Sequence, residues 1–242
     1  MKVLIASLQF ITAIPLGKQQ PFDAKGIMVH FPLAGLAIGL VLASFDHLAG
    51  LLWPQMVVAV LDVVLLAAIS GGLHLDGLAD TADGLCSHRE RKQALAIMKD
   101  SRVGAMGMVA VVCLLLTKAA ALGHVDQNRF MALTLVPAYA RTAMLCGLRW
   151  LPYARSEGGT ASAFFKTPVS AADFRWAAVP VIMSLFLGWQ ALLLNLLFAG
   201  VTVALIVLYR SKLGGITGDL LGAMAEIVET VLFVAMCLGG AA

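Results

Sequence analysis

Charged residues are scarce in this chain of 242 residues, where Asp, Glu, Lys and Arg together make up only 13%. The formal net charge of +3 is small and no patch combines basic with aromatic residues, so no nucleic-acid partner is indicated. Apolar residues reach 60% and the mean hydropathy is +0.91, which excludes an ordinary soluble domain. The composition therefore predicts a protein associated with a membrane.

Cysteine is also rare, and no C-x-x-C motif occurs among the four widely spaced cysteines. We expect buried thiols and predict neither a zinc site nor a disulfide framework. A P-loop, a dinucleotide fingerprint and a Ser/His/Asp arrangement are missing as well. Metal-assisted attack by a substrate hydroxyl is therefore favoured over a covalent enzyme intermediate.

Apolar stretches of roughly 15 to 23 residues recur along the chain, as expected for helices that cross a hydrocarbon core about 30 Å thick. They predict an all-α, polytopic integral membrane bundle that forms one membrane-embedded catalytic domain, residues 1–242. Ahead of the spans, residues 1–17 predict a retained amphipathic helix that lies on the membrane surface. The expected spans are about 27–53, 57–73, 103–123, 130–151, 177–209 and 219–238.

The number of spans depends on residues 177–209, which are long for one crossing and short for two. Asn195 and Gly200 are candidate turn residues if this stretch is a hairpin. Seven crossings with an internal N-terminus place every basic segment in the cytoplasm, as the positive-inside rule requires; without the hairpin the count is six. The basic segments are the N-terminal strip, 84–102, 152–176 and 210–212.

Three of the few acidic residues follow an apolar stretch within residues 74–84. If this run is helical, Asp76, Asp80 and Asp83 lie at i, i+4 and i+7, within about 60° of arc on one face. Three like charges on one face destabilise a helix unless a cation lies among them. Carboxylate oxygens suit Mg²⁺, which also binds substrate phosphates. We expect these three residues to be catalytic metal ligands.

A second acidic stripe lies in the last apolar stretch. Asp219, Glu226 and Glu229 are at i, i+7 and i+10, within about 80° of arc. Carboxylates inside a spanning helix are costly and usually mark a site or a pathway. Asp219 and Glu226 are therefore candidate metal ligands opposite the first cluster. The alternative is polar helix packing, aided by the small Gly222.

Several other residues are candidates for substrate contacts. Lys99 and Arg102 suit phosphate oxygens and Asp100 suits a metal, although flanking positive charge explains the basic pair equally well. Arg141 lies mid-span and needs an acidic partner or an anionic ligand. Asp46 and Asp62 are isolated, and we expect them to be structural. The remaining candidates are His74, Ser101 and a glycine-rich lead-in to the last helix that includes Gly215, Thr217 and Gly218.

At these residues the sequence closely resembles the cobalamin synthase family, also called adenosylcobinamide-GDP ribazoletransferases. The matching motifs run from the first helix to the last, and the acidic one is long and specific. They are F-I-T-x-I-P at 10–15, F-P-L-x-G at 31–35, G-G-L-H-L-D-G-L-A-D-T-x-D-G at 71–84, M-x-D-S-R-x-G at 98–104 and G-x-T-G-D-x-L-G-A-x-x-E at 215–226.

The resemblance implies the last assembly step of the coenzyme B12 nucleotide loop. A ribose hydroxyl of α-ribazole, or of its 5′-phosphate, attacks the cobinamide-side phosphorus of adenosylcobinamide-GDP; GMP leaves, and Mg²⁺ is required. The resemblance also implies the bacterial cytoplasmic (inner) membrane, with the active site facing the cytoplasm. A homo-oligomer, or a complex with other enzymes of this pathway, stays open.

Two alternatives fit the sequence less well. CDP-alcohol phosphotransferases share part of the acidic motif, but Leu73 stands where their first Asp should be and Asp80 departs from their pattern. An ion-coupled transporter could use buried acids in a bundle. It is disfavoured because the first acidic cluster lies at a helix end beside a basic loop.

Overall fold

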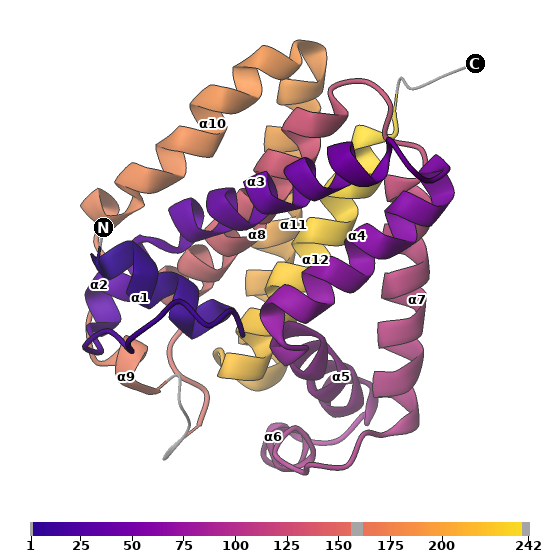
Figure 1. Cartoon of the computed structure of the whole chain (residues 1–242). Helices are drawn as coiled ribbons and strands as arrows, with labels where there is room; N and C mark the ends of the chain where they lie inside the picture. Colours follow the sequence, from indigo (N-terminus) through magenta and orange to yellow (C-terminus); the bar gives the residue numbers. More distant parts are fainter. Residues whose placement is uncertain (1, 156–161, 239–242) are drawn as a thin grey trace.

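The computed structural model describes residues 2–155 and 162–238, and every regular element in them is a helix, which confirms the predicted all-α class (Figure 1). The longer helices form the bundle (Figure 1). In chain order the helices are α1 (Lys2–Ile11), α2 (Ala24–Val29), α3 (Phe31–Ala49), α4 (Gln55–Ser70), α5 (Leu73–Cys86), α6 (Arg91–Ile97), α7 (Ala105–Leu122), α8 (Arg129–Trp150), α9 (Ser162–Phe165), η1 (Ala171–Ala177), α10 (Ala178–Ser184), η2 (Leu185–Leu187), α11 (Trp189–Leu213) and α12 (Gly218–Met236).

Four helices, α3, α7, α8 and α11, are long and apolar enough to cross a membrane. A fifth span arises if α4 and α5, which meet at an angle of 90°, are taken as one broken span. Within the described residues, length and composition thus support four or five spans and a helical membrane protein. α12 has a suitable length of 19 residues but carries three carboxylates.

The sharp bend between α4 and α5 sets the position of the first acidic cluster. Gly71 and Gly72 both have positive φ, 60° and 75°, a conformation that glycine adopts without steric cost. Because of this bend, α5 runs across the end of the bundle instead of continuing the axis of α4 (Figure 1). The three aspartates of α5 therefore lie at one end of the bundle.

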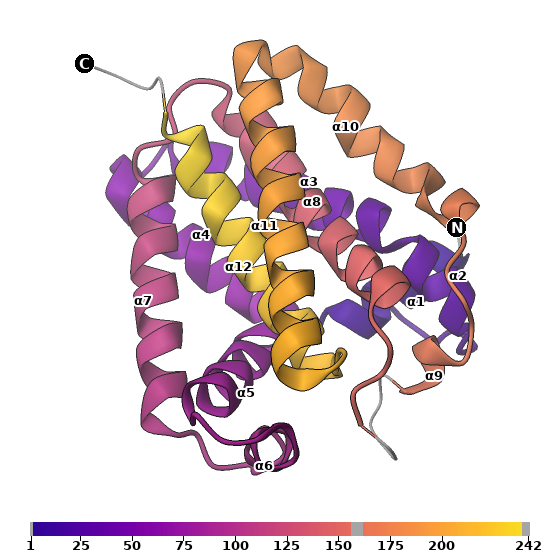
Figure 2. The ribbon, with the colours of Figure 1, turned by 180° about the vertical axis from the view of Figure 1, so that it is seen from behind.

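Residues 177–209 do form a hairpin, but its turn is not at the predicted position. The chain reverses at Gly188, whose φ is 63°, and α10 and α11 diverge from this point (Figure 2). Asn195 and Gly200 both lie inside α11. The Asn195 side chain is accommodated there because it accepts a hydrogen bond from the Tyr139 hydroxyl at 2.9 Å and donates one to the Ala191 carbonyl at 2.8 Å.

The core is built around α8, which is almost entirely buried. α3 crosses α8 so closely that a Cβ added at Gly35 or Gly39 would collide with the backbone of α8 at Pro137 or Thr134. Small residues at such crossings allow helices to approach each other in membranes. The cysteines are free, but the prediction of buried thiols is correct only in part: Cys146 is buried, Cys237 half-buried, and Cys86 and Cys113 exposed.

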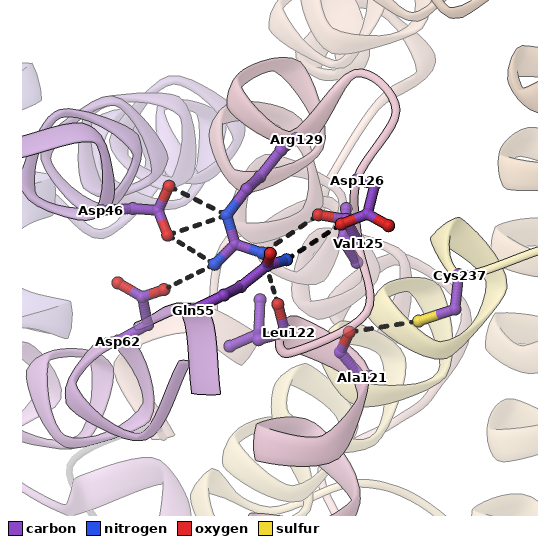
Figure 3. Close-up of polar contacts among 9 residues, drawn as sticks. All are labelled: Asp46, Gln55, Asp62, Ala121, Leu122, Val125, Asp126, Arg129 and Cys237. Carbon is purple, nitrogen blue, oxygen red and sulfur yellow. Dashed lines mark hydrogen bonds and ion pairs between the residues drawn. The ribbon is translucent and has the colours of Figure 1, made fainter. Parts of the chain in front are cut away.

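Asp46 and Asp62, predicted to be isolated, both face Arg129 at the end of the bundle opposite α5 (Figure 3). The Arg129 Nη2 atom lies 2.5 Å from Asp46 and 3.4 Å from Asp62. The same guanidinium donates hydrogen bonds to the carbonyls of Leu122 and Val125. This cluster joins α3, α4 and the loop between α7 and α8, so the predicted structural role of both aspartates fits their contacts.

Candidate active site

The two acidic stripes meet where α5 crosses α12. A Cβ at Gly77 would lie 2.6 Å from the carbonyl oxygen of Asp219 and 3.0 Å from its Cα. A Cβ at Gly222 would lie 3.1 Å from the Cα of His74. One glycine in each helix thus lets the two backbones touch. The crossing brings Asp76, one residue before Gly77, beside the N-terminus of α12.

None of the three carboxylates of α5 forms an ion pair within residues 2–155 and 162–238, and those of Asp76 and Asp80 accept no hydrogen bond from these residues either. Asp76 is exposed and Asp80 is half-buried. Asp80 lies within electrostatic reach of Asp76, Asp83 and Asp219. No three His, Cys, Asp or Glu side chains of the described chain are close enough together to hold a metal by themselves. A cation would therefore rely on one or two carboxylates and on ligands from a substrate.

Asp83 has a second role that the sequence analysis missed. Its two carboxylate oxygens accept hydrogen bonds from the backbone N–H groups of Gly104, at 2.7 Å, and Gly107, at 2.8 Å. These groups belong to the first turn of α7 and would otherwise lack intrahelical partners. A carboxylate is also favourable at a helix N-terminus. Asp83 thus fastens the start of α7 to α5.

Asp219 is paired with an arginine that the sequence analysis did not select. Arg155 Nη2 donates a hydrogen bond to Asp219 Oδ2 at 2.7 Å and another to the Met98 carbonyl at 3.3 Å. Thr217, predicted to bind substrate, instead donates to Asp219 Oδ2 at 3.2 Å and caps α12 by accepting the Leu220 N–H. The only sequence signal for Arg155 is its place in the basic segment 152–176.

A basic groove with a volume of about 640 Å³ adjoins this pair. Lys99 lines it, and three further cations share the wall: Arg91, Lys92 and Arg155. The groove offers the charges that phosphate oxygens require.

The loop that follows Lys99 does not bring all its predicted residues to the groove. Arg102 is exposed and pairs with Asp100 at 2.6 Å. The hydrogen bonds from Arg102 lower the pKa of Asp100 from its ordinary value to about 2, so Asp100 keeps its charge at neutral pH. Ser101 is exposed in the same loop. Asp100, predicted to be a metal ligand, is therefore held by Arg102.

The glycine-rich lead-in to α12 is largely occupied by internal contacts. The Ile216 N–H donates to the Pro152 carbonyl at 2.9 Å, and the Ala154 N–H donates to the Ile216 carbonyl at 2.9 Å. Gly215 lies against Pro152 so closely that a side chain would collide. Gly218, in contrast, lines a cavity together with Asp219. Of the predicted phosphate-binding loop, only its last residue reaches the site.

Glu226, a candidate metal ligand, and Arg141 both belong to a buried ion-pair cluster. Lys118, on α7, donates hydrogen bonds to Glu226 at 2.6 Å and to Glu229 at 2.9 Å, and Arg141 donates to Glu229. All four side chains are buried, and their two positive and two negative charges cancel. The acidic partner that Arg141 requires is thus Glu229. Lys118 was missed, although a lysine inside an apolar span is itself a signal.

His74 is buried and its Nδ1 atom has no hydrogen-bond partner within the part of the chain that the structure describes. It lines a cavity of about 100 Å³, together with Asp76 and Asp219. Within these residues, Nδ1 therefore forms no hydrogen bond to the backbone.

Comparison with known proteins covers almost the whole chain. Residues 3–237 match the family described as cobalamin-5-phosphate synthase. The chain belongs to this family. A relative from Roseiflexus sp. (strain RS-1), named adenosylcobinamide-GDP ribazoletransferase, is 37% identical over 96% of this chain and 88% of its own length. Two further relatives have the same name. The one from Geotalea daltonii is 36% identical over 99% of both chains, and the one from Chlorobaculum parvum is 38% identical over 96% of this chain and 94% of its own.

Membership in the cobalamin-5-phosphate synthase family confirms the predicted resemblance and the predicted enzyme class. Neither the CDP-alcohol phosphotransferase nor the transporter alternative finds support in these matches. No solved structure matches this chain.

Proposed function

We propose that this protein transfers the adenosylcobinamide-phosphate moiety of adenosylcobinamide-GDP to the ribose hydroxyl of α-ribazole or its 5′-phosphate, with release of GMP. The observation that carries the proposal is the contact between Gly77 and Asp219, which brings the unpaired carboxylates of α5 to the N-terminus of α12 within the matched region. The basic groove beside Asp219 supplies a place for the phosphates of the nucleotide.

Asp76 and Asp80 are the residues we assign to Mg²⁺, with Asp219 at the edge of the site. Mg²⁺ usually takes one or two protein carboxylates and completes its coordination with water and substrate phosphates. Two unpaired carboxylates fit this pattern, whereas Asp83, Asp100 and Glu226 already have other partners. When bound, the ion supplies charge neutralisation for the pyrophosphate and its leaving group.

The side chains around the carboxylates orient the two substrates. Arg155 and Lys99 bind phosphate oxygens from the groove, and exposed Arg102 and Ser101 approach the nucleotide from the adjoining loop. Preorganised positive charge of this kind stabilises the charge that develops on a departing phosphate. Arg155 also fixes the carboxylate of Asp219, so one side chain connects the two halves of the site.

We further propose seven crossings within a single domain, made by α3, α4, α7, α8, the continuous helical stretch η1–α10–η2, α11 and α12. Traced in this order, the chain alternates between the two ends of the bundle, and the basic segments 84–102 and 210–212 lie at the end that carries α5 (Figure 1). The positive-inside rule makes this end cytoplasmic. The site then opens to the cytoplasm from a bacterial cytoplasmic membrane.

Detergent-purified protein tests the proposed reaction directly. With adenosylcobinamide-GDP, α-ribazole and Mg²⁺, we expect release of GMP and formation of adenosylcobalamin in equal amounts. Omission of the ribazole should abolish GMP release. The proposal fails if folded protein releases no GMP with either ribazole form.

A further inference from the structure

The cavity beside the carboxylates has a wall that phosphate transfer does not explain. Its volume is about 100 Å³, and most of its lining is apolar. Three phenylalanines line it from separate parts of the chain: Phe10 from α1, Phe31 from α3 and Phe164 from α9. The aliphatic lining includes Ile11, Met144 and Leu221. A site for phosphates and a cation alone requires no such surface.

The three rings pack against one another: Phe164 lies edge-on to Phe10 and tilted to Phe31, and Phe10 and Phe31 are stacked. The Phe10 and Phe164 centroids lie 4.7 Å apart at an interplanar angle of 71°, and those of Phe31 and Phe164 lie 6.2 Å apart. Phe31 and Phe164 are 1% and 2% exposed. Aromatic rings favour a further ring at such distances. This wall therefore suits a flat aromatic group.

The polar content of the wall limits which aromatic group fits. Guanine has many hydrogen-bonding atoms, and burying them against phenylalanines without partners would be costly. A ring with few polar atoms avoids this cost. His74 lies in the same wall with its Nδ1 atom buried and unpaired. A ligand with one ring nitrogen therefore matches this wall, which offers few hydrogen-bonding groups.

We propose that this cavity binds the aromatic base of the acceptor nucleoside, a fused ring with few polar atoms such as the benzimidazole of α-ribazole. The inference rests on the proposed function. It places the ribose of the acceptor next to Asp76 and Asp219, which line the same cavity. The basic groove on the far side of Asp219 is then left for the guanine nucleotide.

The substitution Phe164→Leu tests the aromatic wall, and Phe165→Leu is its matched control in the same short helix. The Phe165 ring contacts Tyr153, at a centroid distance of 4.8 Å, and does not line the cavity. We expect Phe164→Leu to raise the KM for α-ribazole about tenfold, the loss expected for an aromatic contact, while the KM for adenosylcobinamide-GDP stays constant. Phe165→Leu should change neither value. Equal changes in both KM values, or none, for Phe164→Leu would overturn the inference.

A binding measurement separates this inference from the proposed reaction and does not depend on Phe164. Free benzimidazole should raise the melting temperature of the wild-type protein in detergent, because a ligand that binds the native state stabilises it. Leu73→Trp should reduce this shift, since Leu73 lines the cavity yet is exposed enough to accept a larger side chain. If GMP is released but benzimidazole does not stabilise the wild type, the cavity assignment is wrong. If benzimidazole binds but no GMP is released, the proposed reaction is wrong.

Discussion

Arg155 Nη2 lies 2.7 Å from Asp219 Oδ2, and this ion pair connects residues that are 64 positions apart in the chain. Asp219 belongs to the acidic crossing of α5 and α12, whereas Arg155 lines the basic groove. The negative and positive halves of the site therefore share a border at one salt bridge. A substrate with a pyrophosphate can contact both halves at the same time.

Removing charge from the unpaired carboxylates of α5 should abolish most activity. Asp76→Asn and Asp80→Asn preserve side-chain shape but weaken the proposed hold on Mg²⁺, so turnover should fall by about 10²-fold or more. The stabilisation of the folded protein by added Mg²⁺ should also weaken. Asp126→Asn, at the opposite end of the bundle, is the control and should leave both values unchanged (Figure 3). Wild-type turnover of both α5 variants at saturating Mg²⁺ would contradict the assignment.

Gly77→Ala should lower activity without any change of charge. The added methyl group would meet the Asp219 backbone at 2.6 Å, so α5 must move away from α12. Displacing groups that must act together by a fraction of an ångström should reduce turnover about tenfold or more. Gly200→Ala is the matched control, because nothing lies within 4 Å of the new Cβ in α11 and alanine favours helix. Turnover and thermal unfolding in detergent measure both effects, and full activity of Gly77→Ala would show that the close crossing is dispensable.

The buried cluster around Lys118 should respond to substitution as a structural unit. Lys118→Met leaves two glutamates against one arginine, and we expect it to lower the unfolding free energy by about 3 kcal/mol. Adding Glu226→Gln restores charge balance and should recover part of this loss, which a double-mutant cycle measures. For Glu226→Gln alone, activity should fall only in proportion to folded protein. Loss of turnover in a fully stable Glu226→Gln variant would contradict this structural role and would indicate that Glu226 is a metal ligand.

Labelling of single cysteines should show which end of the bundle faces the cytoplasm. On a background without the four native cysteines, Ser101→Cys and Ser211→Cys should label from the cytoplasmic side, and His124→Cys from the other side. All three positions are exposed. Labelling of residues 101 and 211 from opposite sides would exclude seven crossings and would separate the two halves of the site.

Features that depend on local spacing could be predicted from the sequence. The i, i+4 and i+7 pattern of the α5 aspartates follows from helical geometry once the run is helical, and apolar length alone indicates the spans. Length left the hairpin in 177–209 open, and the distribution of basic segments favoured it, but the position of its turn could not be predicted. Asn195 carries a turn signal, yet inside α11 its side chain is satisfied by Tyr139, a contact with a different helix.

Pairings between helices could not be predicted. Periodicity shows that Glu226 and Glu229 share a face with Asp219, but not which helix covers each part of that face. Lys118 covers the glutamates from a helix more than 100 residues earlier, and α5 covers Asp219. The single stripe of the sequence therefore divides into two clusters with different partners.

The buried Lys118–Glu226 pair has a consequence for how the protein is made. The 108 residues that separate the partners take about 5 to 20 s to synthesise, at the usual 5–20 residues per second. During this time α7 and α8 carry Lys118 and Arg141 into the bilayer without their glutamates, which is unfavourable for unpaired charges. Lys118 and Arg141 gain their glutamate partners only when α12 emerges from the ribosome and inserts beside α7 and α8. Insertion of α12 therefore completes the pairing of the buried charges.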